Sequence, residues 1–348
     1  MHSLNIEKGL ESAPPKIVAI GGGTGNYVVL KGLKHHTPNL TAIVAMTDSG
    51  GSSGRLRSEL GQLPPGDIRQ CLIALAPDEH SDLILRQLFD YRFNRGTGLE
   101  GHSFGNLFLA ALTEVSGSIA HAILEAGRML QIKGTVLPVT LTKTNLHAHL
   151  VDGTEVVGEA SIDVRKEKPG VQIDYVYLSP KAYVHPPVAA AIEEADVVVM
   201  GPGDLYTSII PNLLVDGVSD AIRKSRALLV YVCNLMTKPG ESDSFKASDF
   251  VKEILEYLGS GASIDRMLLN ITPFPTRVLN RYERANAYPV EADLEECAHL
   301  VPRIIRRPML AAGAPLRHDS DALAQAIMEI ASEAQVLGES TLFNVTER

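Results

Sequence analysis

A short apolar strand that runs straight into a glycine loop is the feature that most constrains this chain. Residues 17–20 read IVAI, residues 21–25 read GGGTG, and apolar residues with helical spacing follow over 27–34. This order predicts a strand, a tight turn and a helix, the opening unit of a parallel α/β fold. Such a turn lets the backbone approach a phosphate, which the helix N-terminus favours electrostatically. The predicted phosphate contacts are Gly22, Gly23, Thr24 and Gly25.

The glycine loop matches neither of the two common nucleotide-binding fingerprints. The dinucleotide pattern G-x-G-x-x-G, counted from Gly21, needs a glycine where this chain has Asn26. A Walker A loop would continue as Gly-Lys-Ser or Gly-Lys-Thr, and this loop does not. A turn that only packs the strand against the helix stays open as an alternative. The loop by itself therefore predicts a phosphate site without identifying the ligand.

Further short apolar segments predict a doubly wound sheet. They end in glycine-rich or polar loops, among them the loops that contain Gly203 and Asn234. Two buried strands separated by a helix imply a parallel pair with a right-handed crossover, and ligands bind at the carboxyl edge of such sheets. We therefore expect a Rossmann-like α/β fold with a doubly wound, mostly parallel sheet. The later strands are expected at 41–47, 195–200, 227–233 and 266–270.

We expect one α/β domain over residues 16–336, between tails at 1–15 and 337–348. The β-type pattern over 135–165, with an Asp-Gly turn at 152–153, predicts a small antiparallel insertion. Helix-period apolar residues predict several helices outside this insertion. Three of these are expected at 82–93, 106–130 and about 318–336.

The composition disfavours several classes of function. The formal charge of −9 disfavours nonspecific attraction to nucleic acid or anionic lipid, so any phosphate site must be local. Cys71, Cys233 and Cys297 are widely spaced and odd in number, which predicts neither a disulfide framework nor a metal knuckle. No apolar run reaches the length of a membrane helix, and residues 1–16 lack a signal-peptide core. We expect a cytoplasmic protein without membrane insertion or a nucleic-acid partner.

The segment 48–57 carries candidates for further ligand contacts. Asp48 ends the second predicted strand, near the place where an acidic residue binds ribose hydroxyls in dinucleotide folds. Ser52, Ser53 and Arg55 supply hydroxyl groups and a cation that suit a charged ligand. A capping role for Asp48 and a solvent-exposed role for Arg55 stay open as alternatives.

Two patterns that suggest catalysis or metal binding lack their structural context. Residues 101–105 read GHSFG and match the nucleophile elbow, but a glycine-rich loop precedes them where the elbow needs a strand. A helix N-terminus that presents amides at Asn106 fits better. His147 and His149 share one face of a predicted strand, yet no third metal ligand is identifiable. We therefore predict no catalytic residue and no metal site here.

Five ordered segments closely resemble the YvcK-type gluconeogenesis factor family, which belongs to the CofD-like superfamily of 2-phospho-L-lactate transferase. The resemblance covers nearly the whole chain, from about residue 16 to about residue 335. The segments are IVAIGGGTGNYVVLKGLK, SGGSSGRLRSELGQLPPGDIRQ, GHSFGNLFLAALTE, GPGDLYTSIIPNLLV and YVCNLMTKPGESD.

The resemblance implies a modified Rossmann-like fold and a cytoplasmic protein that binds a UDP-sugar, with UDP-N-acetylglucosamine expected. It also implies a role in cell shape and cell-wall metabolism on gluconeogenic carbon sources, through protein partners that the sequence does not identify. By motif, Thr24, Asn106, Tyr282 in RYERANAYPV and Arg317 in PLRHD belong to the UDP-sugar site. Tyr282 can stack on or hydrogen-bond the ligand, and Arg317 supplies a permanent cation.

One departure from the family pattern bears on catalysis. Where the family commonly reads Asp-Asp-Gly-Gly, this chain has Asp48-Ser49-Gly50-Gly51, which removes a carboxylate where the transferase relatives could hold a divalent cation. We therefore favour a noncatalytic regulator that requires no cofactor. The alternative is a metal-assisted phosphotransferase, in which Asp48, with Asp67, would position Mg²⁺ or the acceptor. A monomer and a homodimer both stay open.

Overall fold

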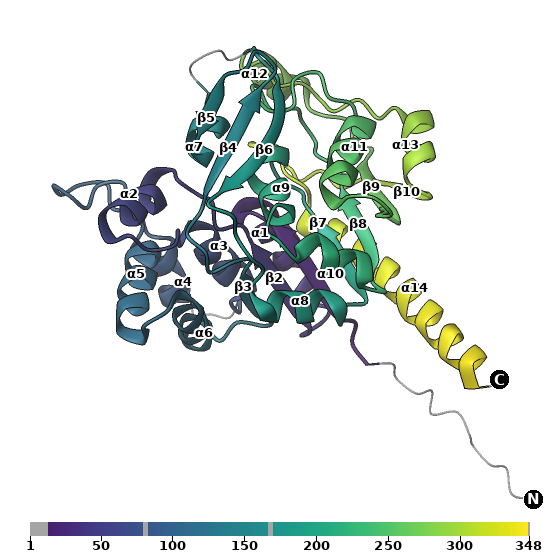
Figure 1. Cartoon of the computed structure of the whole chain (residues 1–348), viewed down its shortest axis with the longest axis horizontal. Coiled ribbons are helices and arrows are strands. Elements are labelled where there is room, and N and C mark those ends of the chain that lie inside the picture. Colours follow the sequence, from purple (N-terminus) through teal and green to yellow (C-terminus); the bar gives the residue numbers. More distant parts are fainter. Residues whose placement is uncertain (1–12, 79–82, 166–169, 347–348) are drawn as a thin grey trace, which may run out of the picture.

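The core of the protein is a seven-stranded sheet in which every pairing is parallel (Figure 1). The computed structural model describes residues 13–78, 83–165 and 170–346. The order across the sheet is β10-β9-β8-β7-β1-β2-β3, which confirms the predicted doubly wound α/β fold. The strands are β1 (Ile17–Gly21), β2 (Leu40–Val44), β3 (Thr135–Pro138), β7 (Val197–Met200), β8 (Leu228–Val232), β9 (Arg266–Asn270) and β10 (Arg303–Arg307).

Helices cover both faces of this sheet because the chain winds in two opposite directions. From β1 it moves through α1 to β2, whereas from β7 it moves the other way, through α10 to β8 and α11 to β9. Right-handed crossovers in opposite directions place their helices on opposite faces. The strands β1 and β7 are buried along their whole length, as a sheet covered on both sides requires. These helices are α1 (Gly23–Leu33), α10 (Val218–Lys224) and α11 (Ala247–Leu258).

The remaining helices complete the layers and the loops around them. The segment predicted as helical over 106–130 is two helices, because Gly117 ends the first with φ +78° and the Ser118 hydroxyl caps the second. The last helix continues to Thr346, beyond the end expected from the sequence. The elements are α2 (Gly51–Leu60), α3 (Gly66–Leu75), α4 (Leu83–Asp90), α5 (Phe104–Ser116), α6 (Ile119–Met129), α8 (Pro186–Glu193), the π-helix Leu205–Ile209, α9 (Ile210–Leu213), α12 (Thr276–Glu283), α13 (Leu294–Leu300) and α14 (Ser320–Thr346).

A small antiparallel sheet stands at the top of the view in Figure 1, with the order β5-β4-β6. The hairpin around Asp152-Gly153 is formed as predicted, but the boundaries of the insertion differ from those expected. Residues 135–138 form β3 at the edge of the main sheet, and the third strand of the small sheet lies beyond residue 165. Its elements are β4 (Asn145–Leu150), β5 (Glu155–Val157), β6 (Ile173–Ser179) and the short helix α7 (Glu159–Asp163).

His147 and His149 are held by contacts within the small sheet. His147 stacks on Tyr177 at 4.9 Å between ring centroids and pairs with Glu155, with 2.9 Å between Nδ1 and Oε1. His149 stacks on Tyr175 in the same way, at 5.0 Å. The two histidines therefore serve cross-strand packing in this structure.

Among the residues that the structure describes, no single helix is long and apolar enough to cross a membrane; only α5 and α6 together pass, bent by 119°.

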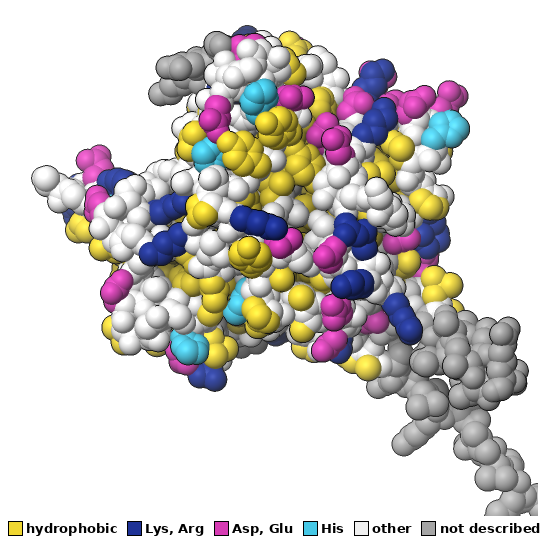
Figure 2. All heavy atoms as spheres, viewed as in Figure 1, with side chains coloured by type: hydrophobic (Ala, Val, Ile, Leu, Met, Phe, Trp, Pro, Cys, Tyr) yellow, Lys and Arg dark blue, Asp and Glu magenta, His cyan; other side chains and the backbone are white. Residues whose placement is uncertain are grey.

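Acidic and basic side chains are interspersed on the face shown in Figure 2, where no large area carries a single sign.

The chain winds in opposite directions from the neighbouring strands β1 and β7, and the loops that follow these two strands touch. A Cβ atom placed on Gly25 would lie 1.7 Å from the carbonyl oxygen of Pro202. Only a glycine lets α1 begin this close to the loop after β7. The contact thus fixes the spacing of the crevice at the sheet's carboxyl edge, the usual ligand position in such folds.

We expect the substitution Gly25→Ala to lower the free energy of unfolding by about 2 to 3 kcal/mol, because the added methyl group overlaps the Pro202 carbonyl. Gly170→Ala is the matched control, because a Cβ there meets nothing within 4 Å. Urea denaturation of both variants measures the difference. A stability for Gly25→Ala equal to wild type would contradict the close approach of the two loops.

Candidate functional site

A cleft of about 480 Å³ opens at the carboxyl edge of the sheet, beside β1 and β7, where the winding direction of the chain changes. The loops after β1, β2, β7 and β8 surround it. The small lobe, which is the antiparallel sheet with α7, contributes α7 to the lining, and residues 316–318 complete it. Eight of the residues predicted from the sequence line this cleft. They are Gly23, Thr24, Gly25, Asp48, Gly203, Asn234, Tyr282 and Arg317.

The glycine loop forms the inner wall of the cleft, and an acidic side chain already uses part of it. Asp67, at the start of α3, accepts a hydrogen bond from the Gly23 amide. The Thr24 hydroxyl donates to Gln70 Oε1 at 3.2 Å. Gly22 is the N-cap of α1 and lies behind these residues, against Ser208. A phosphate at this helix N-terminus would therefore meet Thr24 and Gly25 and lie beside Asp67.

Three predicted site residues do not line the cleft, because they belong to a buried polar network next to it. The Ser52 hydroxyl lies 3.0 Å from His102 Nδ1. Asn106 donates from Nδ2 to Ser53 Oγ at 3.4 Å and accepts from Arg69 Nε at 3.1 Å. This network joins α2, α5 and α3, so these residues support the wall of the site without facing its cavity.

Most of the segment 48–57, expected to supply ligand contacts, lies in a helix. Gly51–Leu60 is helix α2, which begins after the N-cap Gly50 and directs its arginines away from the cleft. Arg55 donates to the Glu100 carbonyl at 2.8 Å. Arg57 donates to Asn145 Oδ1 at 2.7 Å and so attaches α2 to the small lobe.

Carboxylates dominate the floor and one side of the cleft. Loss of hydration and the nearby Asp48 carboxylate raise the pKa of Asp67 to about 7. The same two causes raise the pKa of Glu159 to about 8. Glu159 accepts from the Ser49 amide at 3.2 Å, and Ser49 Oγ accepts from the Ala160 amide at 2.9 Å. Ser49, the departure from the family pattern, therefore caps α7 and holds Glu159 at the cleft.

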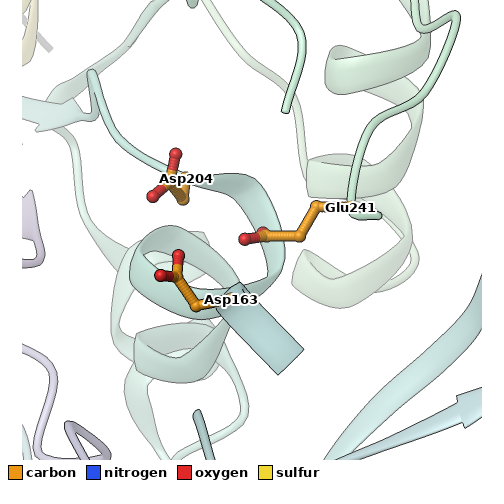
Figure 3. Close-up of side chains that lie close together, drawn as sticks. All are labelled: Asp163, Asp204 and Glu241. Carbon is orange, nitrogen blue, oxygen red and sulfur yellow. The ribbon is translucent and has the colours of Figure 1, made fainter. Parts of the chain in front are cut away.

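Three more carboxylates meet beside the cleft, those of Asp163, Asp204 and Glu241, of which the first two line it (Figure 3). The Lys238 ammonium lies among them, 2.7 Å from Asp204 and 3.7 Å from Glu241, and it also pairs with Asp163. These carboxylates raise the pKa of Lys238, although its burial acts in the opposite direction. Burial raises the pKa of Glu241 to about 8. A metal ion could use this cluster only by displacing the lysine, so its cation is the protein's own.

The cleft also contains a histidine that the sequence patterns did not single out. His318 is 5% exposed and lines the cleft beside Arg317. Burial lowers the pKa of His318 to about 4, so its ring is neutral at physiological pH. It bonds the backbone of Cys233, and Nε2 has no partner among the described residues. A single histidine carries no spacing signal, and only the fold brings it to the end of β8.

Comparison with known proteins identifies the family. The family model described as 2-phospho-L-lactate transferase CofD matches residues 17–310. The chain is 42% identical to the gluconeogenesis factor of Bacillus subtilis over 321 residues, covering 92% of this chain and 99% of that protein. It is 43% identical to the gluconeogenesis factor of Halalkalibacterium halodurans, covering 90% and 95% respectively. The chain therefore belongs to the CofD family.

A solved structure shares this fold. The crystal structure of a member of the UPF0052 family from Bacillus halodurans aligns with a TM-score of 0.84 at 42% sequence identity. The alignment covers 91% of this chain and 99% of that one. The α/β fold of this chain has thus been determined by crystallography in a relative.

The raised pKa of Asp67 gives a pH-dependent prediction. The carboxyl is protonated in the folded protein up to about pH 7, above its usual value of 3.8, so its contribution to stability falls as pH rises from about 4 to about 7. We expect Asp67→Asn to raise the free energy of unfolding at about pH 8, on the order of 2 kcal/mol, because it removes a poorly hydrated charge. Near pH 4 the gain should disappear.

Urea denaturation across this pH range measures the effect of Asp67→Asn. The exposed Glu296, on α13, provides the control Glu296→Gln, for which we expect little change at any pH. A gain that is the same at low and high pH would show that Asp67 is not protonated in the folded state.

Proposed function

We propose that this protein binds UDP-N-acetylglucosamine in the cleft and acts in the cytoplasm as a regulatory factor for gluconeogenic growth, cell shape and cell-wall metabolism. The observation that carries the proposal is that Thr24, Tyr282 and Arg317, which lie far apart in the sequence, line one cleft. The relatives named gluconeogenesis factors support the link to gluconeogenic growth. In this proposal the protein acts through protein partners.

The residues of the cleft suit the parts of a nucleotide sugar. The Leu316 amide donates to the Tyr282 hydroxyl at 3.0 Å, which holds the loop that carries Arg317. The Arg317 guanidinium has no hydrogen bond or ion pair with another described residue, so it is available for a diphosphate. Asn234 is oriented by the Gly203 carbonyl at 2.8 Å and lines the cleft, where its amide can bond hydroxyl groups of a sugar.

The carboxylates of the cleft constrain how a diphosphate can bind. Asp48 and Asp67 stand close to the glycine loop, and two adjacent anions would repel a phosphate. The raised pKa of Asp67 reduces this repulsion, because a proton resides on the pair over part of the physiological range. We therefore expect nucleotide-sugar affinity to increase as pH falls from about 8 to about 6.

Isothermal calorimetry with UDP-N-acetylglucosamine tests the proposal. We expect measurable binding by the wild-type protein, and about tenfold weaker binding by Arg317→Gln, because a charge-assisted hydrogen bond to the diphosphate is lost. The control is Arg303→Gln, an arginine paired with Glu333 away from the cleft. Absence of both binding heat and thermal stabilisation at millimolar ligand would remove the proposal, since a bound ligand must stabilise the folded state.

A metal-assisted phosphotransferase is the second candidate, because the family model is that of a transferase and the carboxylates of Asp48, Asp67 and Glu159 line the cleft. Asp48, Asp67 and Glu159 offer the oxygen ligands that Mg²⁺ prefers, and their mutual repulsion would be relieved by a cation. Their oxygens are not among the described groups of three that lie within 4.8 Å of one another, so the three side chains would have to move together to hold a divalent ion, with Asp48 as the principal ligand. When bound, such an ion would neutralise the charge that develops on a transferred phosphate group.

Incubation with UDP- and GTP-linked donors, Mg²⁺ and a cell extract tests the transferase candidate by mass spectrometry. If the protein is a transferase, donor loss should depend on the protein and should fall strongly in Asp48→Asn, which removes a metal ligand. Glu296→Gln serves as the control. Lack of donor loss across the panel would leave nucleotide-sugar binding without catalysis.

A further inference from the structure

A second cavity, of about 530 Å³, adjoins the cleft on the outer side of α1. Its walls come from α1, α3 and α4, and it shares Thr24, Gln70 and Arg317 with the cleft. We propose that this cavity binds a small organic anion, of the phosphate-ester or carboxylate class, beside the nucleotide-sugar site. The proposal goes beyond the function proposed above and does not depend on it.

Arg69 is the fixed element of this cavity. It is 6% exposed, and its guanidinium is held on one side by Asn106, the Phe89 carbonyl and Asp90, at 3.1, 3.3 and 2.9 Å. These bonds use Nε and Nη1, whereas Nη2 has no partner among the described residues. The bonds to Nε and Nη1 fix the orientation of this buried guanidinium, and Arg69 lines the cavity. A guanidinium held in this way is preorganised to bind an oxyanion.

The second arginine of the cavity, Arg86, forms an ion pair with Asp78, which is also paired with Lys34. Its Nη1 lies 2.7 Å from Asp78, and its Nη2 donates to the Tyr27 hydroxyl at 3.3 Å. Asp78 also pairs with Lys34, whose ammonium is 3.0 Å away and almost fully buried. Among the described residues on this side, one carboxylate is thus shared by two cations, Lys34 and Arg86.

The cavity as a whole is electropositive, in contrast to the acidic cleft. Among the described residues that line it, Arg69, Arg86 and Arg317 are three cations and Asp90 is one carboxylate, so two positive charges are in excess. A concave site with an excess of positive charge favours an anion, and the planar fork of a guanidinium favours carboxylate or phosphate oxygens.

Thr24 and Gln70, joined by a hydrogen bond from the Thr24 hydroxyl to Gln70 Oε1, line both cavities. Arg317 lines both as well. Two ligands could therefore occupy the two cavities at once. This arrangement suits either an acceptor that lies beside a nucleotide or a metabolite whose presence modulates nucleotide-sugar binding.

Calorimetric titration with phosphoglycolate, which carries both a phosphate and a carboxylate, tests the second site. We expect the wild-type protein to bind it, and Arg86→Gln to bind it about tenfold more weakly through loss of a charge-assisted bond. Arg303→Gln is the matched control and should bind like wild type, since its ion pair with Glu333 lies away from the cavity. No binding by wild type, or equal binding by Arg86→Gln, would overturn the proposal.

A second titration separates this proposal from the nucleotide-sugar proposal. Phosphoglycolate is titrated into protein saturated with UDP-N-acetylglucosamine, and we expect binding to persist. Complete loss of binding would mean that the two ligands compete for one site, which would overturn a separate cavity. If UDP-N-acetylglucosamine does not bind at all, the comparison of wild type with Arg86→Gln still decides whether the basic cavity holds an anion.

Discussion

The close contact between the start of α1 and the loop after β7 is the constraint on which the site depends. Where the winding direction of the chain reverses, the loops after β1 and β7 lead to opposite faces of the sheet, and the separation of these loops sets the width of the crevice. Here Gly25 lies against the Pro202 carbonyl, where a side chain has no room. Residues from both halves of the sheet, Asp48 on one side and Asn234 on the other, thereby line a single cleft.

Charge divides the space around this contact into two unlike parts. The cleft and its edge gather carboxylates: Asp163, Asp204 and Glu241 share one cation, Lys238, and Asp67 takes up a proton near neutrality. The neighbouring cavity gathers guanidiniums instead. Burying like charges close together is costly. The cleft reduces its excess negative charge through the proton of Asp67 and the ammonium of Lys238, and in our proposal a bound anion reduces the excess positive charge of the cavity.

The sequence predicted the sheet and the glycine loop because both rest on local patterns, such as the IVAI strand before the loop at 21–25. It failed where long-range packing decides. Arg55 stands in a glycine- and serine-rich segment, yet it lies in helix α2 and donates to the Glu100 carbonyl. Residues 135–138 pair with β2 of the main sheet and not with the small sheet. His318 has no periodic partner, so only the assembled fold places it in the cleft.

The short helix α7 is fastened to both halves of the main sheet. At its start, Glu159 and Ala160 bond Ser49 in the loop after β2, and at its end Asp163 pairs with Lys238 in the loop after β8. A change in the distance between these two loops must tilt or strain this helix. The helix follows β5 directly, so such a tilt would be carried into the strands of the small antiparallel sheet.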